Sequence, residues 1–112
     1  MSTAVIPVSD MLVTVKTREI QRGYFAESSG DSAVAAKHYL AAGHLELVLL
    51  DDYASAGEDQ LAVRSGLSAA SCFWRAGDRD RAVETVEMLK ESYPTFTDEI
   101  EQVIAELRQS GL

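Results

Sequence analysis

Two histidines and one cysteine are the side chains of this sequence best suited to catalysis or metal binding. His38 and His44 are six residues apart, which on a helix corresponds to a rotation of about 240°. They therefore cannot bind the same metal ion. Cys72 lies in an alanine-rich stretch with no histidine near it in the sequence. This setting favours a buried, unreactive thiol over a nucleophile.

Carboxylates gather in one short segment, as the pairs Asp51-Asp52 and Glu58-Asp59. Such oxygen ligands suit a hard cation, but the segment lacks the Asp-x-Asp-x-Asp-Gly pattern of a calcium-binding loop, so we predict a solvated connection. Glycines at the predicted turns stand singly and do not form a phosphate-binding loop. We therefore expect no catalytic residue, no metal and no cofactor, and a protein that is not an enzyme.

The composition indicates an acidic globular protein. The 112 residues include 18 acidic and 10 basic side chains, which give a formal net charge of −8, and 46% of the residues are apolar. Nucleic acids and anionic membranes are bound through lysine and arginine, so neither is an expected partner. The arginines at 75, 79 and 81 alternate with aspartates, which is typical of a solvated helix junction. Basic proteins or peptides suit this overall charge better.

The length and the apolar segments indicate one domain of a water-soluble protein. No apolar run approaches the roughly 18 residues that span a bilayer. A single cysteine cannot form an internal disulfide, so nothing points to an oxidising compartment. We therefore expect a cytoplasmic protein.

Helical periodicity dominates the chain between its two prolines, Pro7 and Pro94, with almost no strand alternation. Both prolines fall where a helix is not expected. The predicted fold is all-α, with five helices in a single domain of residues 1–112. Its predicted parts are an N-terminal extension (1–8), a first hairpin (9–54), a second hairpin (58–93) and a C-terminal capping helix (95–110).

Three local features predict how these helices are arranged. The third helix is rich in small residues, such as Gly66 and Ala70, which let helix axes approach closely, so it should lie at the centre. Gly43 weakens the middle of the second helix by roughly 1 kcal/mol relative to alanine, and predicts a kink or a close helix contact there. The polar stretch 51–59 is predicted to be the main boundary inside the chain.

A weak internal repeat links the two hairpins. Gly30-Asp31 and Gly77-Asp78 each predict a tight turn, and an alanine follows each glycine after five residues. In this pattern the chain resembles the tetratricopeptide repeat family. The segment 67–94 is the stronger match and ends with Tyr93-Pro94, as such a unit does, whereas the segment 19–47 is weaker and has no closing proline. The two glycines are 47 residues apart, whereas the regular repeat measures about 34 residues.

The resemblance implies a short right-handed array of antiparallel hairpins whose first helices line a partner-binding groove. Eight residues would line it: Thr17, Ile20, Tyr24 and Glu27 from the first helix, and Arg64, Leu67, Ser71 and Trp74 from the third. The alternative is that the aromatic residues belong to the core and are covered by the C-terminal helix. The basic clamp with which some family members bind a C-terminal carboxylate is missing from these positions.

The functional hypothesis that follows is a non-catalytic scaffold or adaptor that binds a peptide or helix of a partner protein. A second hypothesis is a small acidic chaperone dedicated to one protein, or a self-assembling subunit of a larger complex. An enzyme or ligand sensor would need a closed pocket with paired ionisable groups, which the sequence does not indicate. The apolar stripe Ile100, Val103, Ile104 and Leu107 should cap the end of the stack, and a homodimer is possible because a short array leaves an apolar face to cover.

Overall fold

The computed structural model describes residues 8–109 (of Val8, the backbone alone). Most of these residues belong to five α-helices. They are α1 (Val8–Ser28), α2 (Ser32–Ser55), α3 (Asp59–Arg75), α4 (Arg79–Ser92) and α5 (Thr97–Gln109), with the short 3-10 helix η1 (Pro94–Phe96) before α5. This described part contains no strand, so the predicted all-α class is confirmed. Almost all of the predicted N-terminal extension, and the end of the predicted capping helix at residue 110, lie outside the described residues.

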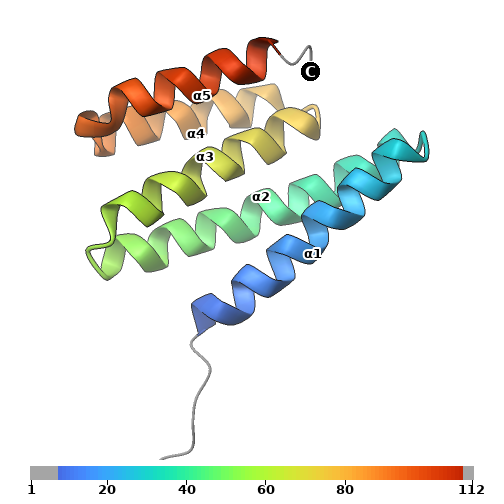
Figure 1. The fold of residues 1–112 in the computed structure, drawn as a ribbon, viewed down its shortest axis with the longest axis horizontal. Helices are drawn as coiled ribbons and strands as arrows, with labels where there is room; N and C mark the ends of the chain where they lie inside the picture. The colour runs from blue at the N-terminus through green and yellow to red at the C-terminus, as the bar shows by residue number, and fades with distance from the viewer. Residues whose placement is uncertain (1–7, 110–112) are drawn as a thin grey trace, which may run out of the picture.

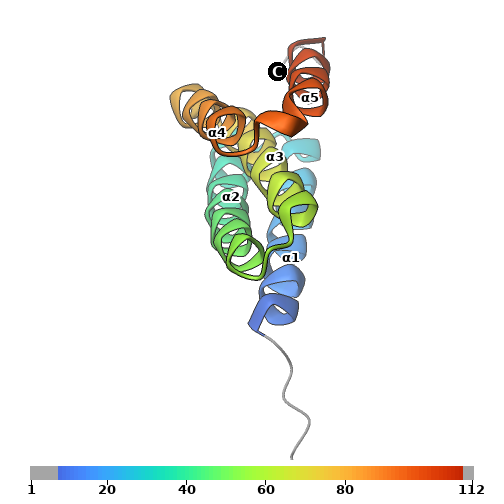
Figure 2. The same cartoon turned by 90° about the vertical axis from the view of Figure 1, so that its left-hand side faces the viewer.

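The helices pack in chain order. α1 packs on α2, α2 on α3 and α3 on α4, and α5 contacts α4, η1 and α3. Figure 1 shows the helices running back and forth as a row, with α1 at one end and α5 at the other. Seen roughly along the helix axes in Figure 2, α2 and α4 lie on one side, α1 and α5 on the opposite side, and α3 between them. This arrangement is compatible with the resemblance to tetratricopeptide repeats.

The same turn connects each of the first three helices to the next. Gly30, Gly57 and Gly77 have φ angles of 79°, 74° and 86°, which only glycine adopts readily. In each turn the next amide donates to the carbonyl five residues earlier, at 2.9 Å, as in a Schellman motif. The repeat seen in the sequence therefore has a third member at Gly57. It escaped notice because it lies inside the polar stretch 51–59, where α2 in fact continues to Ser55 and only residues 56–58 form the turn.

Each of the first three helix pairs meets at a glycine. In each pair, a glycine of the earlier helix makes room for a large side chain of the later one. An added Cβ would lie 2.6 Å from Tyr39 at Gly23, 2.5 Å from Phe73 at Gly43, and 2.5 Å from Leu89 at Gly66. Such separations are far below a normal carbon–carbon contact. The close helix contact predicted at Gly43 is therefore confirmed.

The core lies along α3, which has neighbours on several sides. Its small residues Ala62, Ser65, Gly66, Ala69 and Ala70 are buried, as predicted for the central helix. At the far end, Ile100 of α5 is fully buried, and Val103 and Ile104 pack against the same cluster. In residues 8–109 no helix is both long enough and apolar enough to cross a membrane.

Candidate functional site

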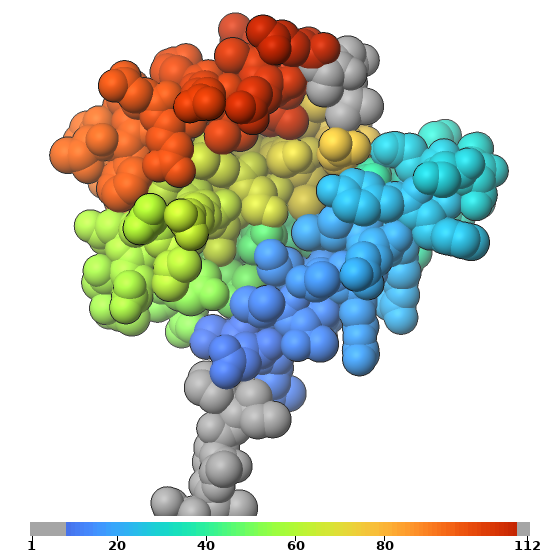
Figure 3. Space-filling view, in the orientation of Figure 1, coloured from blue at the N-terminus to red at the C-terminus, as the bar shows by residue number. Residues whose placement is uncertain are grey.

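The residues predicted to line a groove fall into two groups. On α1, Thr17, Tyr24 and Glu27 are exposed and Ile20 is half-buried. On α3, Arg64 is exposed and Ser71 is half-buried. Helical spacing puts Arg75 on the same side of α3 as Arg64 and Ser71, because positions i, i+7 and i+11 share one face. We call these seven residues the α1–α3 face: Thr17, Ile20, Tyr24, Glu27, Arg64, Ser71 and Arg75. Figure 3 views this side of the molecule, where α3 lies between α1 and α5.

Leu67 and Trp74 do not belong to this face. Leu67 is only 6% exposed and packs in the core cluster that includes Ile100 of α5. Trp74 is half-buried and lines a hollow of about 260 Å³ between α3, α4 and α5, with the guanidinium of Arg79 4.1 Å from its ring centroid. Both residues lie on the flank of α3 that turns toward α5. The alternative, that the aromatic residues belong to a core covered by the C-terminal helix, therefore describes Trp74 in part, whereas Tyr24 is exposed.

Aromatic and charged side chains meet at the centre of the α1–α3 face. The guanidinium of Arg75 lies 5.4 Å from the Tyr24 ring centroid, and its Nη1 lies 3.7 Å from Oε1 of Glu27. The buried Tyr39 of α2 donates its hydroxyl hydrogen to the same oxygen at 3.2 Å. Burial, together with the Glu27 carboxylate, raises the pKa of Tyr39 to about 12, so this hydroxyl remains a donor at neutral pH. Arg75 was missed in the sequence because the alternating charges at 75–81 indicated a solvated junction.

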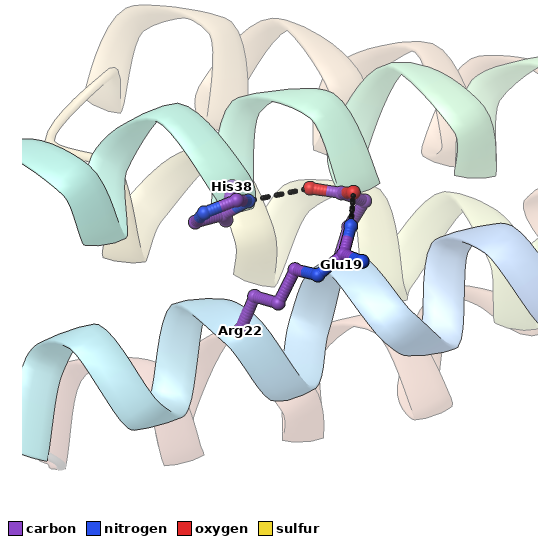
Figure 4. A network of polar contacts seen from close by, with 3 residues as sticks. All are labelled: Glu19, Arg22 and His38. Atoms are coloured by element: carbon purple, nitrogen blue, oxygen red, sulfur yellow. Dashed lines mark hydrogen bonds and ion pairs between the residues drawn. The ribbon is translucent and has the colours of Figure 1, made fainter.

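Glu19 links α1 to α2 through a small polar network, shown in Figure 4. Its Oε2 lies 2.6 Å from Nδ1 of His38, and its Oε1 accepts a hydrogen bond of 2.8 Å from Arg22. The hydrogen bond with His38 is the main reason that the pKa of Glu19 is lowered. The other histidine, His44, has different neighbours: Arg81 donates to its Nε2 at 2.7 Å. In residues 8–109, no three His, Cys, Asp or Glu side chains are grouped so that they could hold a metal ion.

A second polar contact between α1 and α2 is buried. Nζ of Lys16 lies 3.2 Å from Oε2 of Glu46, whose side chain is 1% exposed, whereas that of Lys16 is 22% exposed. The other carboxylate oxygen of Glu46 has no hydrogen-bond partner among the described residues. Glu46 lies on a helix face that is otherwise apolar, and it was not among the predicted site residues.

Cys72 is buried in the cluster formed by α1, α2 and α3. Burial, and next the negative charge of Glu46, raise the pKa of this thiol to about 11. Because the thiolate is the reactive form, we expect iodoacetamide to modify Cys72 at pH 8 roughly 100-fold more slowly in the native protein than in the urea-unfolded chain. Mass spectrometry over time measures both rates. Native modification as fast as that of the unfolded chain would contradict this description of the thiol.

The α1–α3 face therefore offers an exposed aromatic ring, two arginines and hydroxyl groups, a combination suited to holding a polypeptide. No protein-family model, curated protein or solved structure gives a significant match to this chain.

Proposed function

We propose that this protein is a non-catalytic interaction module, a scaffold or adaptor that binds a peptide or helix of a partner protein through α1 and the α1–α3 face. One observation carries this proposal: five of the nine exposed large apolar side chains in the described residues are on α1. They are Met11, Val13, Val15, Tyr24 and Phe25. Val13 and Tyr24 lie on the side of α1 that belongs to the α1–α3 face, and the other three lie on the opposite flank. Exposed apolar side chains concentrated on one helix in this way favour its use as a surface that another polypeptide covers.

Tyr24 is the proposed anchor of the α1–α3 face. Its side chain is 49% exposed, and the Arg75 guanidinium against its ring limits the freedom of both groups before a partner arrives. Tyrosine and arginine are the residue types that most often dominate binding energy. Arg64 is exposed on the same face and forms no ion pair within residues 8–109, which leaves its charge available to a partner. As part of this proposal, the stack is a tetratricopeptide-like right-handed array, and the protein works in the cytoplasm, where a free thiol stays reduced.

The proposal predicts that position 24 contacts the partner. A photo-crosslinking amino acid at position 24 should capture a specific protein in cells, whereas the same group at the exposed position 84 on α4 should not. With that protein purified, Tyr24→Ala should weaken binding by roughly tenfold or more. It should lower the melting temperature only modestly, because the ring is half exposed and loses only its contacts with Tyr39 and Arg75. Equal crosslinking from both positions, or an unchanged affinity of the Tyr24→Ala variant, would count against the α1–α3 face as a binding surface.

Self-assembly, as a subunit or a dedicated chaperone, is the second candidate, and the same exposed apolar residues of α1 favour it. Light scattering across a tenfold dilution separates the two. A stable dimer that dissociates when Tyr24 is replaced by alanine would mean that the α1–α3 face binds a second copy of the chain. A monomer would mean that this face is available to a different protein.

A further inference from the structure

The two ends of the helical row differ in what they present to solvent. At one end, α5 turns its apolar stripe inward, and the exposed residues of this helix are polar apart from Ala105. At the other end lies the α1–α2 hairpin, which no other described helix covers on its outer side. A row of helical hairpins buries its apolar faces by stacking, so a terminal face is normally polar. The α1 end does not follow this rule.

A regular stripe of exposed side chains runs along α1 on the flank opposite to Val13 and Tyr24. Its members are Met11, Val15, Arg18, Arg22 and Phe25. The alternating spacing of four and three residues keeps them on one side of the helix and is the spacing of a helix–helix seam. Phe25 is 76% exposed, the highest value among the large apolar side chains. Two arginines thus lie between apolar residues.

A matching stripe runs along α2 with the same spacing. It consists of Val34, His38, Ala41, Leu45 and Val48. The contacts of Glu19 with His38 and of Lys16 with Glu46 fix the antiparallel register of the two helices, which puts Phe25 near the level of Val34 and Val15 near that of Leu45. We call the two stripes together the hairpin end surface.

A hollow of about 340 Å³ lies at the Phe25 end of this surface. Its apolar lining comes from Phe25, Ala26 and Val34, and its polar lining from Arg18, Gln21, Arg22 and His38. The lining of the hollow thus combines apolar and basic side chains, a chemistry that suits one large apolar side chain flanked by carboxylates.

The charge at this end differs from that of the whole chain. Residues 1–40 contain four acidic and four basic side chains, so the entire net charge of −8 comes from residues 41–112. Arg18 forms no ion pair within the described residues, and the ion pair of Arg22 with Glu19 lies at the surface. Charges beyond about 8 Å are largely screened at physiological salt, so these nearby arginines determine which partner charge is favoured here.

A second copy of the chain is a poor occupant. Two hairpin end surfaces facing each other would bring arginines against arginines at the centre of the contact, and like charges there oppose association. Stacking the α5 end of another copy onto it would offer acidic residues, but within Thr97–Gln109 this helix has no large exposed apolar side chain for the hollow. The observations therefore favour a different protein that carries both features on one segment.

We infer that the hairpin end surface binds an acidic amphipathic helix of another protein. This helix lies along the seam between α1 and α2, seats an apolar side chain in the hollow beside Phe25, and places carboxylates on Arg18 and Arg22. The inference rests on the proposed function, since it names a partner for α1, but it concerns the flank of α1 that faces away from Tyr24.

The test uses two fluorescent designed helical peptides of about 20 residues, long enough to follow α1. Both carry leucines at four- and three-residue spacing; the first has glutamates at the two central seam positions and the second has lysines there. Fluorescence anisotropy with the full-length protein should show at least tenfold tighter binding of the glutamate peptide. Arg18→Glu should reverse this preference, since Arg18 has no ion pair that the fold would lose.

Matched variants locate the contact. Phe25→Ser should weaken binding of the glutamate peptide at least tenfold, whereas Val83→Ser, at an exposed apolar position on α4, should not; circular dichroism confirms that both variants are folded. Equal binding of the two peptides, or full binding by Phe25→Ser, would overturn the inference. A homodimer that Phe25→Ser dissociates would also overturn it by making a second copy the occupant. Loss of binding with Tyr24→Ala alone would move the site to the α1–α3 face, so the inference would fail and the proposed function would stand.

Discussion

Replacing Lys16 by methionine is expected to lower the free energy of unfolding by about 3–5 kcal/mol, although its own side chain is partly exposed. The reason is its partner. Glu46 is almost completely buried, and one of its carboxylate oxygens already has no hydrogen-bond partner in the described residues. Without Lys16, the remaining oxygen would also lose its counter-charge. Urea unfolding followed by circular dichroism measures the change.

Two variants test whether burial is the cause. Arg22→Met removes an ion pair of the same helix whose arginine side chain is 60% exposed, and should cost at most about 1 kcal/mol. The double variant Lys16→Met with Glu46→Leu removes both charges and should restore most of the stability or exceed it, because well-packed apolar residues often replace a buried ion pair without loss. If Lys16→Met lowers the free energy of unfolding as little as Arg22→Met does, then the contact of Lys16 with Glu46 does not stabilise the fold as proposed.

Replacing Gly43 by valine is expected to destabilise the protein by about 3 kcal/mol, in spite of the helix propensity gained by removing a glycine. A Cβ at this position would lie 2.5 Å from the ring of Phe73. That ring is fully buried, so it cannot rotate out of the way, and α2 and α3 would have to separate. Thermal unfolding measures the loss.

Ala41→Val is the matched control, because it adds a β-branched side chain to the same helix at an exposed position two residues away. It should change the stability by about 0.5 kcal/mol, the ordinary propensity difference. Similar losses for Ala41→Val and Gly43→Val would mean that the close approach of α2 and α3 is not what makes Gly43 necessary.

Helix positions could be predicted well from this sequence, because the signals that start and end helices are local. The second hairpin was predicted to span residues 58–93 and to end at Tyr93-Pro94, and in the structure α3 begins at Asp59 and α4 ends at Ser92. The Gly57 turn is as regular as the other two, but Glu58 makes no side-chain cap where Asp31 and Asp78 do. Glycine is followed by aspartate at the other two turns, but by Glu58 at this one, so the sequence pattern that predicted those turns was absent here. Polar residues at the end of α2 also resembled a loop.

The rotation of each helix against its neighbours could not be predicted in the same way. Periodicity shows which residues share a face, but it does not show which neighbour that face meets. Leu67 and Trp74 were therefore assigned to an open groove, although they turn toward α5. The contacts of Lys16 with Glu46 and of Glu19 with His38 join residues 30 and 19 positions apart, and no local pattern connects such pairs.

The chain-order packing of the helices has a consequence for how the protein reaches this structure. Only three residues separate each of the first three helices from the next, so the loops that close when neighbouring helices dock are short and lose little chain entropy. Proteins dominated by such local contacts fold rapidly, since few distant segments need to find each other. Each hairpin can therefore assemble soon after its second helix is synthesised, and α5 completes the stack last.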